Sequence, residues 1–163
     1  MQTQIGTLLH EDHMTTIETL QNLEEYLGRH RKAPQVDDAV KAMLTRLAAT
    51  LREEVEKHFG FEENHLFPVF TAQGETGIVM MLTHEHRSIL PLATQTADLA
   101  SEAAASGFTE QSWRDFADTR AELIEREIFH IQKEEMGLLA AISALVAPDV
   151  DAKLAVTYKE VVG

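Results

Sequence analysis

The sequence predicts an all-α protein, an antiparallel up-down-up-down four-helix bundle with a short C-terminal helical tail. Three observations support this fold class. Only four prolines and eight glycines interrupt the 163 residues, and no segment alternates like a β-strand. Short connections between long helices favour antiparallel neighbours. Apolar residues also recur with helical periodicity over four long stretches. These stretches are residues 5–32, 37–66, 77–105 and 109–146.

The first two predicted helices are bounded by prolines. The apolar stripe of the first helix includes Ile5, Leu9 and His13, and Pro34 lies in the interruption that follows it. Pro68 is expected to end the second helix, because proline lacks a backbone N–H and its ring clashes with the preceding turn. The first half of the chain therefore reads as a helical hairpin.

The third and fourth helices carry clear boundary signals. Gly107 is expected to end the third helix. Thr109 is expected to be the N-cap of the fourth, with Phe108 and Trp113 placed around it as in a hydrophobic staple. Pro148 follows the fourth helix, and apolar residues in the tail suggest packing against the bundle. The predicted domain organisation is a bundle over residues 1–147 and a tail over residues 148–163.

Composition narrows the classes of partner and site. The net charge of −13 disfavours nucleic acid and anionic membranes as partners, since both require a basic surface. The absence of cysteine excludes disulfides, thiolate zinc sites and cysteine-ligated iron–sulfur clusters. The first residues, MQTQIGTLLHEDH, have neither the basic nor the apolar region of a signal peptide, and no long apolar window occurs. We therefore expect a cytoplasmic location.

The two halves of the chain repeat one pattern of histidine and glutamate. Each half has a helix with one inward histidine, followed by a helix with His-x-x-x-Glu. The aligned pairs are His13 with His86, His58 with His130, and Glu62 with Glu134. At about 1.5 Å of rise per residue, the four histidines fall at one level of the bundle. A single core histidine is more often structural, but four at one level of an apolar core indicate a bound ligand.

The repeated pattern favours a metal site. Residues four apart share a helix face, so each His-x-x-x-Glu presents an imidazole beside a carboxylate. A buried carboxylate is costly unless it is paired or bound to metal, and two that face each other are worse. Mixed nitrogen and oxygen ligation suits iron, manganese or zinc. Four histidines and two glutamates would give each of two metals two imidazoles and a share of two bridging carboxylates, leaving a position for a small ligand.

The segments LLHEDHMTTI, HFGFEENHLFP, HEHRSIL and HIQKEE carry a family resemblance. On these segments the sequence resembles the hemerythrin-like (HHE cation-binding) family across nearly its whole length. The resemblance implies two non-haem iron ions bridged by carboxylates and by an oxo or hydroxo group. It implies as ligands His13, His58, Glu62, His86, His130 and Glu134.

One departure from the oxygen-carrying members bears on function. Those members have a fifth histidine on the third helix, whereas Leu82 and Leu90 flank His86 here. The pattern is therefore more similar to the iron-centre repair proteins of the family. Those proteins usually have a cysteine-containing N-terminal domain, which we do not expect here because the sequence has no cysteine. Further residues are candidates for orienting the ligands or relaying protons. These candidates are Asp12, Glu54, Glu85, His10 and His65.

The leading hypothesis is a non-haem di-iron protein that binds or reacts with O2, peroxide or NO, in oxidative or nitrosative stress or in iron handling. The alternative is an iron or oxygen sensor, or an iron donor, that acts without turnover. Besides the small ligand, the expected partners are a redox partner or an iron-accepting client. A purely structural bundle with neutral core histidines is the third reading. A ferritin-type reading of Glu62–His65 and Glu127–His130 fits less well, because their spacing does not match the repeat. Whether the protein is an enzyme stays open.

Overall fold

The computed structural model describes residues 2–163, with every side chain in that range except that of Glu54. Helices account for all the regular structure of this part of the chain, and no strand occurs in it, so the all-α prediction is confirmed. Within residues 2–163, no helix is both long enough and apolar enough to cross a membrane.

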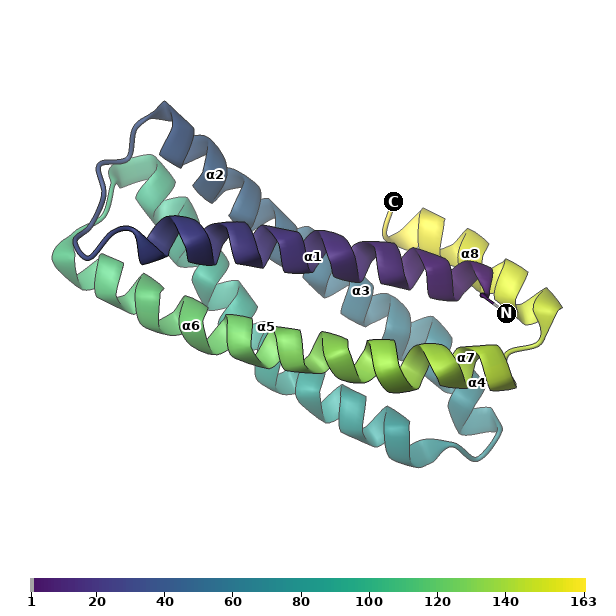
Figure 1. The fold of residues 1–163 in the computed structure, drawn as a ribbon. Helices are drawn as coiled ribbons and strands as arrows, with labels where there is room; N and C mark the ends of the chain where they lie inside the picture. The colour runs from purple at the N-terminus through teal and green to yellow at the C-terminus, as the bar shows by residue number, and fades with distance from the viewer. Residues whose placement is uncertain (1) are drawn as a thin grey trace.

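The elements follow the order expected from the sequence. The first long helix is α1 (Gln4–Gly28), and the third is α5 (Thr76–Ser106). The second comprises α2 (Asp38–Ala49), η1 (Thr50–Val55), α3 (Glu56–Phe61), η2 (Glu62–Leu66) and α4 (Phe67–Ala72). The fourth comprises α6 (Glu110–Lys133), η3 (Glu134–Leu138) and α7 (Leu139–Leu145), and α8 (Pro148–Val161) follows it. Figure 1 shows that consecutive long helices run in opposite directions and that α8 folds back near the N-terminus.

The expected start of the fourth helix is confirmed. The Thr109 side chain accepts a hydrogen bond from the Ser112 N–H at 3.0 Å, and the Ser112 hydroxyl accepts one from the Thr109 N–H at 2.9 Å. This reciprocal pair satisfies two backbone donors that a helix start otherwise leaves free. The rings of Phe108 and Trp113 lie 5.0 Å apart, as the hydrophobic staple predicts.

Two boundary predictions are wrong. The first helix ends at Gly28 rather than at residue 32, because the N–H groups of Arg29 and His30 bond to carbonyls only three residues back and close the last turn. Pro68 does not end the second helix, which continues to Ala72. Proline is tolerated there because it lies in the first turn of α4, directly after the wide turn of η2.

The core has two apolar clusters with a polar layer between them along the helices. One cluster lies toward the α1–α2 connection and includes Leu23, Leu44 and Phe116. The other lies toward the termini and includes Leu9 and Phe70. Buried histidines and glutamates occupy the level between the clusters. The apolar clusters therefore fix the four helices on both sides of the polar layer.

The tail joins the bundle through an unexpected contact. Oδ2 of Asp151 in α8 accepts a hydrogen bond from the Gln4 N–H at 2.9 Å, and Oδ1 accepts one from the Ile5 N–H at 2.8 Å. The carboxylate thus caps the start of α1, where free N–H groups and the helix dipole favour negative charge. Tyr158 of α8 packs against Phe61, with ring centroids 5.0 Å apart.

Candidate metal centre

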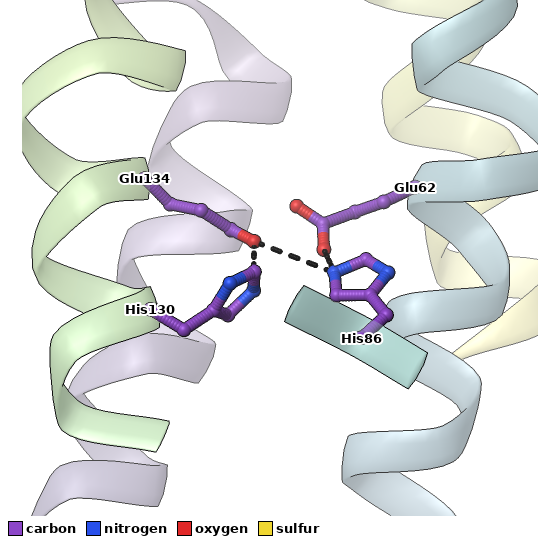
Figure 2. A group of neighbouring side chains, drawn as sticks. All are labelled: Glu62, His86, His130 and Glu134. Atoms are coloured by element: carbon purple, nitrogen blue, oxygen red, sulfur yellow. Dashed lines mark ion pairs between the residues drawn. The ribbon is translucent and has the colours of Figure 1, made fainter. Parts of the chain in front are cut away.

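The structure brings all six predicted ligands to one place in the core. The histidines come from α1, α3, α5 and α6, and each glutamate is the first residue of a π-helical turn, η2 or η3. All six side chains are buried. They are His13, His58, Glu62, His86, His130 and Glu134. Figure 2 shows four of them, with Glu134 and His130 on one side, Glu62 and His86 on the other, and the side chains pointing toward one another.

Their donor atoms form two groups that share one carboxylate. Glu62, His86, His130 and Glu134 each contribute an atom to a group whose members lie within 4.8 Å of one another. His13 and His58 form a second such group with Glu134. Oε1 of Glu134 lies 2.5 Å from His130 Nε2, whereas Oε2 lies 3.0 Å from His13 Nε2. The two oxygens of one carboxylate thus face different groups, as a carboxylate shared by two cations does.

The second glutamate also approaches histidines from both groups. Oε1 of Glu62 lies 3.3 Å from His86 Nε2 and 3.6 Å from His58 Nε2. Both glutamates are fully buried, at 0% exposure. Two facing carboxylates at this depth repel each other strongly, so positive charge must compensate them.

The unsatisfied polar atoms fit a bound metal. Among the described residues, the buried Nε2 atoms of His58, His86 and His130 have no hydrogen-bond partner, and neither do both oxygens of Glu62 or Oε1 of Glu134. His130 Nε2 and Glu134 Oε1 are close but do not align as donor and acceptor. Leaving such groups unpaired in a core is costly. Lone pairs that converge without bonding to one another are satisfied when a cation lies between them.

Carboxylates lie at the outer ring nitrogen of every site histidine. Glu135 lies 2.5 Å from His13 Nδ1, Asp12 lies 3.2 Å from His58 Nδ1, and Glu85 lies 2.8 Å from His130 Nδ1. Glu63 lies farther from His86 Nδ1, at 3.8 Å. A carboxylate at Nδ1 favours the tautomer with hydrogen on that atom, which leaves the Nε2 lone pair for a metal.

These outer carboxylates repeat the symmetry of the sequence. Asp12 and Glu85 each precede a site histidine, and Glu63 and Glu135 each follow a site glutamate. Asp12 and Glu85 were expected near the site from the sequence. Glu63 and Glu135 were not, although the offset that aligns Glu62 with Glu134 aligns them too.

The remaining predicted residues have different outcomes. His10 contacts the site indirectly, since its Nδ1 lies 2.8 Å from the Glu135 carboxylate that also bonds to His13. His65 is exposed and lies beside the ring of Phe61, so it does not join the buried cluster of histidines and glutamates. The side chain of Glu54 lies outside the described part of the structure.

Both site glutamates begin a widened helical turn. The Phe67 N–H donates to the Glu62 carbonyl and the Leu139 N–H donates to the Glu134 carbonyl, each five residues back. A π-helical turn inserts an extra residue and changes the direction of nearby side chains, and such turns are frequent at functional sites. Their matching positions show that the duplication extends to the backbone.

The titration behaviour follows from this crowding of charges. Burial lowers the pKa of His130, but the Glu134 carboxylate, 2.5 Å from its Nε2, outweighs burial and raises the pKa to about 10. Burial raises the pKa of Glu134, yet the hydrogen bond from His13 and the close imidazole of His130 hold it well below its usual value. Burial and the nearby charge of Glu134 raise the pKa of Glu62. A metal that binds these imidazoles displaces any proton they carry, so its affinity depends on pH.

A further carboxyl group and a small cavity adjoin the site. Glu127, one helical turn before His130, is 3% exposed, and its Oε2 has no hydrogen-bond partner among the described residues. Burial raises the pKa of Glu127. A cavity of about 10 Å³ lies beside it. The polar part of the cavity lining includes Asp12, His13, Thr16, His58, Glu127 and His130.

The sequence model for the hemerythrin HHE cation-binding domain matches residues 4–156. No match is found among curated proteins. The matched range includes all six residues of the buried cluster and most of α8.

Proposed function

The chain belongs to the hemerythrin HHE cation-binding domain family, and on that basis we propose that it holds two iron ions. The proposed ligands are the four buried histidines and the two buried glutamates. We further propose that the iron pair binds or reacts with a small ligand, O2, peroxide or NO, in oxidative or nitrosative stress or in iron handling.

The observation that carries this proposal is the pair of donor groups that share Glu134. Each group contains two histidines, and the group with His86 and His130 also contains Glu62. His13 Nε2 bonds to Glu134 Oε2 at 3.0 Å, but the other converging atoms have no hydrogen-bond partner among the described residues. These atoms are the Nε2 atoms of His58, His86 and His130, both oxygens of Glu62, and Oε1 of Glu134. Two cations that share carboxylates remove both the repulsion between the glutamates and the cost of the unpaired atoms.

The donor set and its surroundings support iron. Imidazole with carboxylate ligation suits iron, and the chain has no cysteine to favour a thiolate-bound metal. When bound, the iron pair supplies redox chemistry and a position for an exogenous ligand. The protein's own residues hold the metals, orient the imidazoles through the outer carboxylates, and exclude bulk water by the apolar clusters on either side.

The surroundings of His86 argue against reversible oxygen carriage. Oxygen-carrying relatives are expected to have a fifth histidine on this helix, whereas Leu82 lies one turn before His86 and is 1% exposed. Leu90 occupies the position one turn after His86. The site thus offers fewer nitrogen ligands than a carrier, which favours reaction with the ligand or transfer of iron.

Metal analysis tests the proposal directly. Protein purified without chelators should contain about two irons per chain, and chelation should lower its thermal stability because bound metal stabilises only the folded state. Anaerobically reduced protein exposed to O2 should develop absorption bands of oxidised, oxygen-bridged iron. Fewer than about one metal per chain, with stability unchanged by chelation, would contradict the proposal.

A second measurement separates reaction from delivery. Decay of peroxide or reduction of NO at catalytic rates supports a reactive centre. Transfer of iron to an acceptor protein depleted of its own metal supports the alternative of an iron donor without turnover. A stable oxygen adduct that reverses under vacuum would instead indicate a carrier.

A further inference from the structure

We propose that helix α8 is a gate for the metal centre. The ring of Tyr158 on this helix blocks the movement of His58, so metal enters and leaves after α8 has separated from the bundle. This inference rests on the proposed function, since it concerns the exchange of the same iron pair. It goes beyond that function because it assigns the C-terminal helix the control of metal entry and release.

The proposed ligands are too deeply buried for a metal ion to reach them while every helix stays in place. His58 is the most exposed of the six, at 6%. The cavity beside the site has a volume of about 10 Å³, close to the smallest space that holds one water molecule. A metal ion with its hydration shell is larger than that. Exchange of metal therefore requires part of the protein to open locally.

Tyr158 occupies space that His58 needs in order to move. An imidazole leaves a metal by rotating about its side-chain bonds into neighbouring space. The rings of Tyr158 and Phe59 fill such space, each with its centroid 6.4 Å from that of His58 and in edge contact with it. Phe59 belongs to the same bundle helix as His58, whereas Tyr158 comes from α8. Separation of α8 thus frees a proposed ligand without separating any two of the four long helices.

His86 has a different environment. Its ring stacks on Phe59 and Phe67, with centroids 3.8 and 5.8 Å away, and both of these residues belong to the second long helix of the bundle. Freeing His86 from them would require α5 to move away from that helix. The His58 side of the site is therefore the side that opens at the lower cost.

Helix α8 is built to separate as a unit. It lies against α1 and α3 on the outside of the bundle (Figure 1). Val146 and Ala147, both in an extended conformation, join it to α7, and no side chain caps its first turn. A helix of 14 residues has little stability of its own, so contacts with the bundle hold it in place. Loss of these contacts releases α8 while the other helices stay folded.

Two side chains of α8 set the balance between its closed and open positions. Asp151 favours the closed position, because its two oxygens accept hydrogen bonds from the N–H groups at the start of α1. Tyr158 has two opposing effects. Its ring packs on Phe61, but its hydroxyl is buried with no hydrogen-bond partner among the described residues. Opening gives that hydroxyl water to bond with, so the tyrosine makes α8 easier to open than a phenylalanine would.

Three variants distinguish opening of α8 from a general loss of stability. Asp151→Ala removes the bonds that hold α8 to α1, and Tyr158→Phe removes the unpaired hydroxyl while keeping the ring. Leu44→Ala is the control, because Leu44 is fully buried in the apolar cluster toward the α1–α2 connection. Its loss should destabilise the bundle about as much as Asp151→Ala does.

The measurements follow metal release and helix opening separately. Each protein is loaded anaerobically with ferrous iron and mixed with an excess of a ferrous chelator, and the rate at which the iron–chelator complex appears is recorded. Hydrogen exchange of the α8 backbone amides is measured with and without iron.

The two α8 variants should change the rates in opposite directions. Asp151→Ala should release iron about 10- to 100-fold faster than wild type, and its α8 amides should exchange faster. Tyr158→Phe should release iron about three- to tenfold more slowly, and its α8 amides should exchange more slowly. Leu44→Ala should keep both wild-type rates, although it melts at a lower temperature.

The outcomes separate this inference from the function on which it rests. Leu44→Ala that releases iron as fast as Asp151→Ala would tie release to general stability and overturn the gate. Tyr158→Phe that releases iron as fast as wild type, or faster, would overturn it too. Both results leave the iron site intact. Wild-type protein that takes up no iron contradicts the proposed function and the gate together.

Discussion

Replacing Asp151 by alanine should destabilise the whole bundle, although this residue lies in the tail. Its carboxylate accepts hydrogen bonds from the N–H groups of Gln4 and Ile5, at 2.9 and 2.8 Å. Asp151 is 7% exposed and Ile5 is 0% exposed, so water cannot easily replace the bond to Ile5. The exposed Gln4 can be rehydrated more readily.

The magnitude follows from these two bonds. A hydrogen bond to a charged group contributes roughly 1.5–3 kcal/mol when its donor would otherwise be buried without a partner. The bond to Ile5 should contribute about 2 kcal/mol, and the more accessible bond to Gln4 about 1 kcal/mol. We therefore expect Asp151→Ala to lower the free energy of unfolding by about 3 kcal/mol. Asp151→Asn, which keeps one acceptor oxygen, should lose about half of that.

Urea denaturation of the metal-free protein, followed by helical circular dichroism, measures the effect. At a slope of about 2 kcal/mol per molar urea, the midpoint of Asp151→Ala should fall by roughly 1.5 M. Asp149→Ala is the matched control, because it removes an exposed acidic residue from the same first turn of α8. Its cost should stay below about 1 kcal/mol. Equal midpoints for the two alanine variants would refute the capping role of Asp151.

Three further predictions concern the metal site. Glu134→Ala should retain less iron than Glu62→Ala, because Glu134 contributes to both donor groups. Iron analysis of the two purified variants measures the retention, and equal iron content in both would contradict the prediction. In metal-free protein, the pKa of His130 is raised from 6.5 to about 10, so its contribution to stability is fully present below about pH 6.5 and is lost as the pH rises toward 10. Thermal melts should therefore show chelated protein losing more stability than iron-loaded protein between about pH 7 and about pH 9. Glu135→Gln should weaken iron binding about 10- to 100-fold, because it replaces the carboxylate at His13 Nδ1. Competition with a chelator measures the affinity for iron. An unchanged affinity would show that this carboxylate does not tune the imidazole.

The proposed ligands could be predicted because their pattern is local. His58 and Glu62 share a helix face through their spacing of four residues, whatever the rest of the chain does. The same holds for His130 and Glu134, and the duplication relates the two pairs. Thr109 could be identified as an N-cap for a similar reason, since its partner Ser112 lies three residues away.

Pro68 shows where local reasoning failed. A proline inside an α-helix removes a backbone hydrogen bond and kinks or breaks the helix, and the prediction assumed that Pro68 would end a regular α-helix. The structure instead places a π-helical turn directly before Pro68, and the helix continues. A π-helical turn is stabilised by how its side chains pack across the bundle, and the sequence of the turn carries no sign of it.

The sequence by itself determined the helices, the duplication, and the level at which four histidines meet, because helical periodicity fixes the face and the height of each residue on its own helix. Only the tertiary structure decided which carboxylate meets which imidazole, that Asp151 caps a helix 146 residues away, and that Glu127 lines a cavity of one-water size. These contacts depend on the rotation and axial offset between helices. Side-chain packing in the two apolar clusters sets both quantities, and no local pattern records them.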